Sequence, residues 1–488
     1  MHAWRLLAAL VALAFHAGAG TAHAHGGRPQ TYDVVADPGD AQTLVVPATF
    51  GTLISRDDGL TWASLCIEAM PDPRPGTLRP FVVTEASSIL VGQSFGLVRG
   101  PMLGCGWAYV RSGPREPFII DLVASGTSTF ALRSDAGVAN QVFRVSMDGT
   151  ELTPLAASFA LGFLPERLRI APSDSTRFWV TGTVQRAESA ARDGRLYVSS
   201  DAGATYAMHE VPFTGDERTF RVLAVDPRNA SRALAVLQSG VVDRLVELQI
   251  DAGGALVLQE IASLDARAVA TERPFGLAMA ADGTAYFGNN VQGLYRRDPR
   301  GALTVLDADL NIACAVIHEG TLWLCTDGYP DADGDGFALA RQDLRLPFAP
   351  VPALRYADIR GPTSCGDGSD AVCSAFYRDL LRDWGRLLPD AGVVALDASG
   401  SLDAEAAIDA GTGLDAEASE TPDAPADARF LFDANPRRDA GTAAAPAGCG
   451  CVVGAGARPL GAGWLALAGL ALAGLALTRR AGRRRACR

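Results

Sequence analysis

The sequence predicts an all-β fold: a β-propeller of seven four-stranded blades within residues 25–388, followed by a disordered acidic linker and one C-terminal transmembrane helix. Two observations carry the propeller prediction. From residue 30 to about residue 360, short apolar runs alternate with Gly, Asp and Pro, and no long stretch has a helical period. A strand followed by an Asp- and Gly-rich turn also recurs every 45 to 53 residues, which is the length of one propeller blade. The turns fall at Asp57, Leu103, Asp148, Asp201, Asp251, Asp298 and Asp343.

The N-terminus is typical of a secretory signal peptide that covers residues 1–24. Arg5 supplies the positive charge, residues 6–15 form the apolar run, and Ala22-His23-Ala24 is a small-residue cleavage site. A buried N-terminal helix is the alternative interpretation. Export would place the mature chain in an oxidising compartment, where disulfides persist.

Two octapeptides, SRDDGLTW at residues 55–62 and SSDAGATY at residues 199–206, share the pattern S-x-D-x-G-x-T-aromatic. An Asp side chain can accept hydrogen bonds from turn amides, and Gly tolerates the positive φ of a tight turn. Ser and Thr add local bonds to the backbone. The pattern therefore predicts two structural turns, formed by Ser55, Asp57, Gly59, Thr61 and Trp62 and by Ser199, Asp201, Gly203, Thr205 and Tyr206.

Both octapeptides resemble the Asp-box, or BNR repeat, of sialidase-like β-propellers. The resemblance implies a hairpin turn between the two outer strands of a blade, with the aromatic ring packed against the neighbouring blade. It also raises a sialidase-like activity as a possible function. The sequence nearest to the R-I-P motif of sialidases is RIAP at residues 169–172, which is interrupted and lies in the middle of the propeller region. No catalytic residue can therefore be carried over from that family.

The composition of the chain argues against one class of partner. The chain contains no lysine and has a formal net charge of −12, which argues against a nucleic-acid partner. Because propellers present loops at one end of a central channel, we expect a non-enzymatic recognition or scaffold module for a protein or glycan at the cell surface. A glycoside hydrolase of the sialidase-like type is the alternative, and paired carboxylates at the channel mouth would favour it.

Six of the nine cysteines lie in the propeller region, and an even number in an exported chain predicts disulfides. The sequence CAVIHEGTLWLC at residues 314–325 is typical of a hairpin that places Cys314 opposite Cys325. The short loop from Cys365 to Cys373 is the next expected pair. Cys66 would then pair with Cys105.

One acidic turn, DADGDG at residues 331–336, is a candidate calcium loop. Asp331, Asp333 and Asp335 have the spacing of loop positions 1, 3 and 5, and Gly336 occupies the position of the sharp turn. Position 12 is Gln342 rather than the bidentate glutamate of an EF-hand. A weak calcium site and a solvated acidic turn both remain open, and no other cofactor is expected.

The composition changes after the propeller region. Residues 389–447 are rich in Ala, Asp and Gly with almost no aromatics, so they cannot bury enough apolar surface to offset the entropy of ordering. We expect a disordered linker there. A short helix is predicted just before it, at residues 375–388, where Phe376, Leu380, Leu381, Trp384 and Leu387 share one face.

The C-terminal segment, residues 448–488, contains three parts in order. Cys449 and Cys451 are followed by an apolar run at residues 460–478, long enough to cross a bilayer of about 30 Å, and then by a cluster of arginines. Those arginines predict that the C-terminus stays cytoplasmic and that the propeller lies outside.

The arrangement of these three parts resembles the MYXO-CTERM sorting signal of myxobacterial surface proteins. That resemblance implies a sorting protease that removes the helix, with lipid attachment at a retained cysteine. Without such processing, the same segment is a single-span anchor. In both cases we expect the protein at the cell envelope or cell surface.

Overall fold

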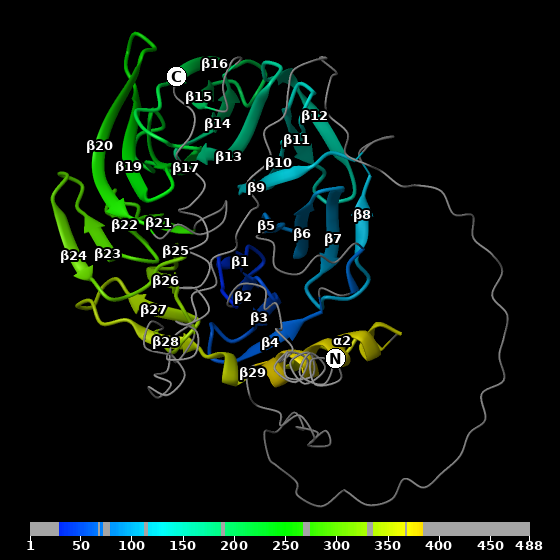
Figure 1. Ribbon diagram of the computed structural model, residues 1–488. Helices are drawn as coiled ribbons and strands as arrows, with labels where there is room; N and C mark the ends of the chain where they lie inside the picture. Colours follow the sequence, from blue (N-terminus) through cyan, green and yellow to red (C-terminus); the bar gives the residue numbers. More distant parts are fainter. Residues whose placement is uncertain are drawn as a thin grey trace, which may run out of the picture. The chain divides into compact units, whose positions relative to one another are not determined.

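The computed structural model describes residues 29–66, 69–71, 79–111, 116–186, 191–266, 274–328, 335–366 and 368–383. Within these residues seven β-sheets surround a central channel, and each sheet is one blade built from consecutive strands (Figure 1). The first strand of each blade lies nearest the channel and the fourth lies at the rim. The predicted all-β propeller with seven four-stranded blades is confirmed.

The strands follow one another around the ring in chain order. Blades 1, 2 and 3 contain β1 (Val35–Asp37), β2 (Asp40–Ala48), β3 (Gly51–Ser55) and β4 (Trp62–Leu65); β5 (Phe81–Val83), β6 (Ser88–Gln93), β7 (Gly96–Pro101) and β8 (Ala108–Val110); and β9 (Ile119–Ser125), β10 (Ser128–Arg133), β11 (Gln141–Val145) and β12 (Leu152–Ser158). Blades 4 and 5 contain β13 (Phe163–Ala171), β14 (Asp174–Gln185), β15 (Arg192–Ser199) and β16 (Ala207–Val211); and β17 (Thr219–Val225), β18 (Arg232–Gln238), β19 (Val242–Ile250) and β20 (Leu256–Asp265). Blades 6 and 7 contain β21 (Phe275–Met279), β22 (Ala285–Asn289), β23 (Gly293–Arg297) and β24 (Leu303–Asp307); and β25 (Cys314–His318), β26 (Thr321–Cys325), β27 (Leu339–Asp343) and β28 (Val351–Leu354).

Six of the seven turn positions found in the sequence lie between the third and fourth strands of a blade, and the seventh ends a third strand. Asp57 follows β3, Leu103 follows β7, and Asp148 follows β11. Asp201, Asp251 and Asp298 follow β15, β19 and β23, whereas Asp343 is the last residue of β27. The repeat in the sequence therefore has both the period and the phase of the blades.

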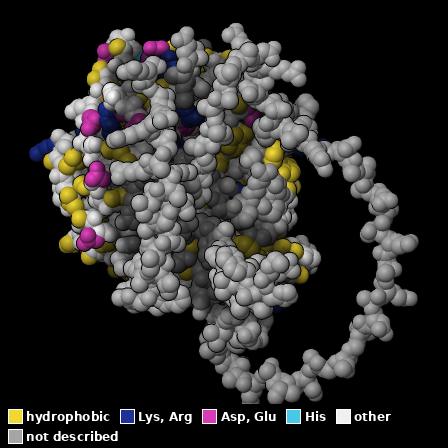
Figure 2. Space-filling view, in the orientation of Figure 1, with side chains coloured by type: hydrophobic (Ala, Val, Ile, Leu, Met, Phe, Trp, Pro, Cys, Tyr) yellow, Lys and Arg dark blue, Asp and Glu magenta, His cyan; other side chains and the backbone are white. Residues whose placement is uncertain are grey.

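The apolar core lies between adjacent blades. Val45 and Ile54 of blade 1 pack in one cluster with Ile89 and Val91 of blade 2, and all four are buried. Middle strands such as β6 and β18 are buried on both faces, which explains their continuous apolar sequences. The fourth strands, such as β20 and β24, are more exposed. Acidic side chains lie among apolar ones along the rim at the left of Figure 2, which is the side of β20 and β24 in Figure 1.

The seam between blade 7 and blade 1 closes the ring. Thr31 donates to the carbonyl oxygen of Ala338 at 2.6 Å, and Trp62 Nε1 donates to that of Ala353 at 3.0 Å. Trp62, Trp323 and Leu354 belong to one buried cluster that spans the seam. Among the described residues, all four strands of blade 7 come from residues 314–354, so the seam is not closed by a strand from the N-terminal side of the chain.

After blade 7 the chain returns across the outer edge of blade 1. A short 3-10 helix η2 (Tyr356–Asp358) leads into β29 (Ile359–Pro362), which pairs in parallel with β4 and makes this sheet five-stranded. Helix α2 (Ser369–Asp383) follows and packs against β29, with the Tyr377 hydroxyl donating to the carbonyl oxygen of Ile359 at 2.6 Å.

The predicted helix exists, but it begins six residues earlier than the apolar pattern indicated. Asp370 accepts hydrogen bonds from the Cys365 and Gly366 amides and from the Ser364 hydroxyl, and so fixes the chain just ahead of the helix. Leu380 and Leu381 are buried as expected. Trp384 and Leu387 lie outside the described residues.

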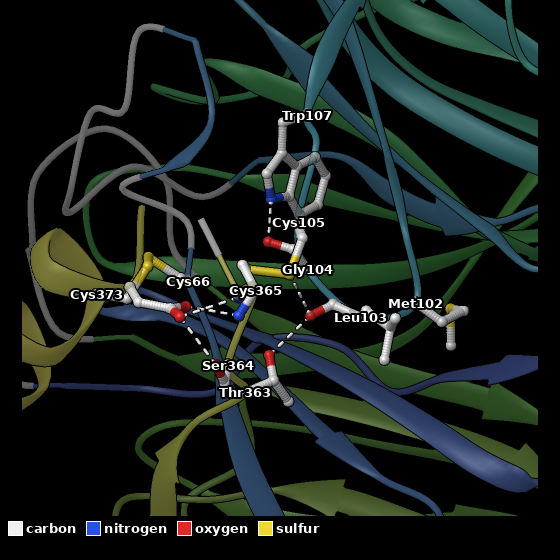
Figure 3. The surroundings of a disulfide bond; sticks show 12 residues. Cys66, Met102, Leu103, Gly104, Cys105, Trp107, Thr363, Ser364, Cys365 and Cys373 are labelled. Atoms are coloured by element: carbon white, nitrogen blue, oxygen red, sulfur yellow. Dashed lines mark hydrogen bonds between the residues drawn. A yellow bond between two sulfur atoms is a disulfide. The ribbon is translucent and has the colours of Figure 1, made fainter. Parts of the chain in front are cut away.

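Three disulfides are present among the described residues, and only one has the expected partners. Cys314 pairs with Cys325, because the hairpin register places them directly opposite one another. The expected pairs Cys365–Cys373 and Cys66–Cys105 are wrong. The structure instead joins Cys66 to Cys373 and Cys105 to Cys365, because the C-terminal strand runs back over blades 1 and 2 (Figure 3). The same figure shows Thr363 Oγ1 donating to the carbonyl oxygen of Leu103 at 2.7 Å.

Several sequence-based expectations lie outside the described residues. They are the signal peptide at residues 1–24, the linker at 389–447, the segment 448–488 with Cys449 and Cys451, and Asp331 and Asp333 of the acidic turn. In the part of the chain that the structure describes, no helix is both long enough and apolar enough to span a bilayer.

Candidate functional site: the central channel

The central channel holds a cavity of about 540 Å³. Most of its lining comes from the first strands of the blades, and a period of two decides which side chains reach it. In β13 and β17, Leu168, Phe220 and Val222 point away into the blades and are fully buried. Arg167, Arg169 and Arg221 alternate with them and line the channel. The apolar positions thus anchor each strand while the charged positions face the cavity.

A buried carboxylate holds two arginines side by side in the channel wall. Asp121 of β9 accepts from Arg167 Nη1 at 2.9 Å and from Arg169 Nη1 at 3.0 Å. Its second oxygen also accepts from the Leu168 amide at 2.8 Å. The Asp121 side chain is 3% exposed, whereas those of Arg167 and Arg169 are 32% and 28% exposed. Asp121 therefore positions the two guanidinium groups rather than facing a ligand itself.

Glu166 is a carboxyl group of the channel whose pKa is strongly raised. It accepts from the Phe220 amide at 3.0 Å and from Thr183 Oγ1 at 3.3 Å. Burial raises its pKa to about 7, although the nearby positive charge of Arg221 works in the opposite direction. Near neutral pH this carboxyl is therefore partly protonated.

Two further ionisable groups come from the N-terminal segment. Asp33 is partly buried, and its desolvation raises its pKa despite the nearby charges of Arg169 and Arg167. Burial also raises the pKa of Tyr32 to about 12, so its hydroxyl stays protonated and accepts a hydrogen bond from the Arg79 amide at 3.2 Å. Both residues line the cavity.

The described lining contains five arginines and three carboxyl groups. This excess of positive charge is opposite in sign to the whole chain, which carries a net charge of −12. The arginines are Arg79, Arg167, Arg169, Arg192 and Arg221, and the carboxyl groups are Asp33, Asp121 and Glu166.

The residues of the two octapeptides do not line this cavity, and they form the turns between the third and fourth strands of blades 1 and 4. Asp57 accepts from the Thr61 amide at 2.8 Å and from the Thr61 hydroxyl at 2.7 Å, and Ser55 Oγ donates to it at 2.8 Å. Burial works in the opposite direction, but hydrogen bonds from Thr61 and Ser55 lower the pKa of Asp57. Ser199, Asp201 and Thr205 repeat the same bonds in blade 4, and the pKa of Asp201 falls to about 2.

The glycine and the aromatic residue of each octapeptide contact the preceding blade of the ring. Gly59 has a φ of +77°, and a Cβ atom there would lie 2.5 Å from Trp323 of blade 7. In the second octapeptide Gly203 has a φ of +84°, and the Tyr206 ring lies 5.0 Å from that of Phe159, which follows β12. The residues at these positions close a turn and fill a gap between blades.

Asp335 is the one described carboxylate of the candidate calcium loop. It accepts from the Asp327 amide at 3.0 Å, and burial raises its pKa to about 6. No cluster of metal-ligating side chains occurs among the described residues. Gln342, the residue at loop position 12, donates instead to the carbonyl oxygen of Asp343 at 2.6 Å.

The sequence did not lead us to the residues that line the channel. Arg169 is the first residue of the RIAP sequence, and it does line the channel, but as a partner of Asp121. A usable signal was present in the sequence, because arginines alternate with apolar residues in RLRI and FRV at residues 167–170 and 220–222. These strands come first in their blades, and the alternation therefore points the charges into the channel.

No protein-family model matches the chain, and no curated protein matches it in sequence. Solved structures match the chain only at low similarity. The extracellular domain of a one component system from B. thetaiotaomicron has a TM-score of 0.41 and 11% identity, over 65% of this chain and 38% of that chain. A Mycobacterium tuberculosis puromycin-hydrolyzing peptidase has a TM-score of 0.45 and 14% identity, over 68% and 53%. Saccharomyces cerevisiae Sqt1 has a TM-score of 0.43 and 8% identity, over 69% and 87%.

The chain spans only 38% of the first of these structures, and 46% of a puromycin hydrolase that is also similar. Likenesses of this degree say nothing about ligand or activity.

Proposed function

We propose that this protein is an exported recognition module that binds a protein or glycan of the cell envelope at its central channel, without catalysing a reaction. One observation carries the proposal. Each carboxyl group of the described lining accepts a hydrogen bond from the protein itself: Asp121 from two arginines, Glu166 from Phe220 and Thr183, and Asp33 from the Val34 amide. A glycosidase needs two carboxyl groups that face the scissile bond.

Export is supported by the three disulfides, since such bonds persist in oxidising compartments. We also propose that the two octapeptides belong to the Asp-box class, because their internal hydrogen bonds are the same in blades 1 and 4. Anchoring at the envelope through residues 448–488, with Cys449 or Cys451 as a processing site, is part of the same proposal.

A glycoside hydrolase is the second candidate, and Glu166 is the observation that favours it. A carboxyl group with a pKa of about 7 has the proton affinity of a general acid at neutral pH. Its two oxygens already accept hydrogen bonds from the protein, however, and its neighbours in the channel are mainly arginines.

The test is capture from envelope extract with the epitope-tagged full chain, alongside a turnover assay. We expect the chain to retain envelope protein or glycan, and a channel variant, Arg221→Gln, to retain less. We also expect no release of fluorophore from umbelliferyl sialosides and other umbelliferyl glycosides. Turnover that Glu166→Gln abolishes would establish the hydrolase. Retention by neither parent nor variant would refute recognition at the channel.

A further inference from the structure

The three disulfides of the described residues differ in how far solvent reaches them. Cys105 and Cys365 are only partly buried. The other two disulfides are buried, with exposed fractions between 0% and 6% for Cys66, Cys373, Cys314 and Cys325. A thiol must reach a sulfur atom in order to exchange with a disulfide, so exposed disulfides are the labile ones. Cys105–Cys365 is therefore the pair that a thiol in solution can attack without opening the fold.

The backbone next to both partly buried cysteines leaves open space. Gly106 follows Cys105 and Gly366 follows Cys365, with φ values of +66° and +67°. Both values lie in the left-handed region, which glycine adopts without steric cost. A Cβ atom at either glycine would meet no described atom within 4 Å. A reactant therefore has room to approach beside each cysteine.

The C-terminal segment stays attached to the propeller when this one bond opens. β29 still pairs in parallel with β4, and the buried Cys66–Cys373 bond still ties α2 to blade 1. Cys105–Cys365 instead ties the segment to blade 2, as Figure 3 shows. Opening this bond therefore loosens only the join between the segment and blade 2.

Hydrogen bonds keep the opened site in place, so that the bond can close again. Asp370 accepts from the Cys365 amide at 2.5 Å and from the Gly366 amide at 2.9 Å. The Thr363 hydroxyl donates to the carbonyl oxygen of Leu103, in the loop between β7 and β8, at 2.7 Å. These bonds hold the residues on both sides of Cys365 without the help of the disulfide.

We propose that Cys105–Cys365 is a redox-active disulfide, at which a thiol exchanges reversibly while the other two disulfides stay closed. The thiolate of the reactant attacks one sulfur of the pair, forms a mixed disulfide with it and releases the other sulfur as a thiolate. The released thiolate takes up the proton that the reactant thiol lost. A second reactant thiol then displaces the first, so that two reactant thiols are oxidised to a disulfide and two cysteines are reduced. The inference goes beyond the proposed function, because it assigns a chemical reaction to the join between the propeller and the C-terminal segment.

The reactant is either a small thiol or a protein dithiol, and differential alkylation of the full chain in detergent distinguishes the two. Thiols that are already free, including any of Cys449, Cys451 and Cys487, are first blocked with N-ethylmaleimide, and the excess is removed. The chain is then treated with glutathione or with reduced thioredoxin. New thiols are labelled with iodoacetamide and located by peptide mass spectrometry.

With at least one reactant, Cys105 and Cys365 should be labelled at least about tenfold faster than the four buried cysteines, because a thiol reaches only the exposed pair. The reactant that opens the pair identifies the source of the thiol. Oxidised glutathione, added after the reactant is removed, should close the pair again. Labelling of the buried cysteines at the same rate, or no labelling of any pair before the chain unfolds, would overturn the inference.

The double variant Cys105→Ser, Cys365→Ser tests the assignment to this pair. It should lose the early labelling and still unfold cooperatively, since β29 and the buried disulfide hold the segment. The double variant Cys314→Ser, Cys325→Ser is the matched control, and its Cys105 and Cys365 should be labelled at the rate of the parent. Early labelling that persists in the first variant would contradict the assignment.

Discussion

Glu166 links the chemistry of the channel to the stability of the fold. Its pKa is about 7 in the folded protein and near 4.5 when exposed. The folded state therefore holds this proton more tightly than the unfolded state does. The resulting stabilisation is complete below pH about 4.5 and is lost as pH rises through about 7.

Glu166→Gln should remove this loss, because an amide cannot ionise but can still accept from Phe220 and donate to Thr183. Relative to the parent, the variant should gain free energy of unfolding between pH 5 and pH 8, on the order of 3 kcal/mol at the upper end. Urea unfolding at several pH values measures this. Glu210→Gln is the control, because the Glu210 side chain is 70% exposed. The free energy of unfolding of this variant should depend on pH as it does in the parent. Parallel profiles for parent and Glu166→Gln would contradict the assignment.

Asp57 is expected to stabilise the fold without contributing to binding. Asp57→Ala removes the acceptor of the Thr61 amide and hydroxyl, so it should lower the free energy of unfolding by about 1 to 3 kcal/mol. Asp58→Asn is the control, because Asp58 is the exposed neighbour with a φ of +54°, which Asn also adopts. Loss of envelope binding at an unchanged melting temperature would show that this turn has a direct role in recognition.

At the scale of single residues, contacts between neighbours in the sequence could be predicted, whereas contacts between residues far apart in the sequence could not. The turn bonds of Asp57 and Asp201 follow from side chains within four residues of one another. The pairing of Asp121 with Arg167 and Arg169 joins residues 46 and 48 positions apart on different blades. No short pattern encodes such a pair, because it exists only after the ring has closed.

Among the elements, we expect the C-terminal segment from η2 to α2 to contribute most to stability. It forms β29 on blade 1 and is tied down by two disulfides with sequence separations of 307 and 260. Long loops lose more entropy on cross-linking than short ones, in the chain-entropy description. The hairpin disulfide Cys314–Cys325 closes a separation of only 11 residues.

Replacing Cys66, Cys373, Cys105 and Cys365 by Ser should therefore cost more stability than replacing Cys314 and Cys325. We expect a difference of at least about 2 kcal/mol in the free energy of unfolding. Removing one long-range pair should cost less than half of removing both, since the remaining pair still holds the segment. Chemical unfolding followed by tryptophan fluorescence measures these differences. A larger loss for the hairpin pair would contradict the role given to the C-terminal segment.

The disulfide that could be predicted is the one set by hairpin register. Cys314 and Cys325 face each other because the turn at His318–Thr321 aligns their strands. The other two pairs depend on where residues 359–373 lie against blades 1 and 2, and nothing in their own sequence gives that path. Nearness in the sequence was a poor guide, because α2 begins between Cys365 and Cys373.

For the whole molecule, the period of the sequence was sufficient to predict seven blades. A repeat that cannot bury its apolar faces alone must stack on its neighbours, and a closed ring of such units encloses a channel. The content of that channel could not be predicted in the same way, because five of its arginines come from several different blades. Global architecture was therefore easier to infer than the site.

Hydrogen–deuterium exchange on the full chain with retained envelope ligand tests most directly whether recognition takes place in the channel. Ligand should slow exchange in peptides that cover β13 and β17, which carry Arg167, Arg169 and Arg221. The outer strands β20, β24 and β28, which expose Val257, Val305 and Val351, should exchange as in the free protein. Slower exchange confined to those outer strands would place recognition on the rim and contradict binding in the channel.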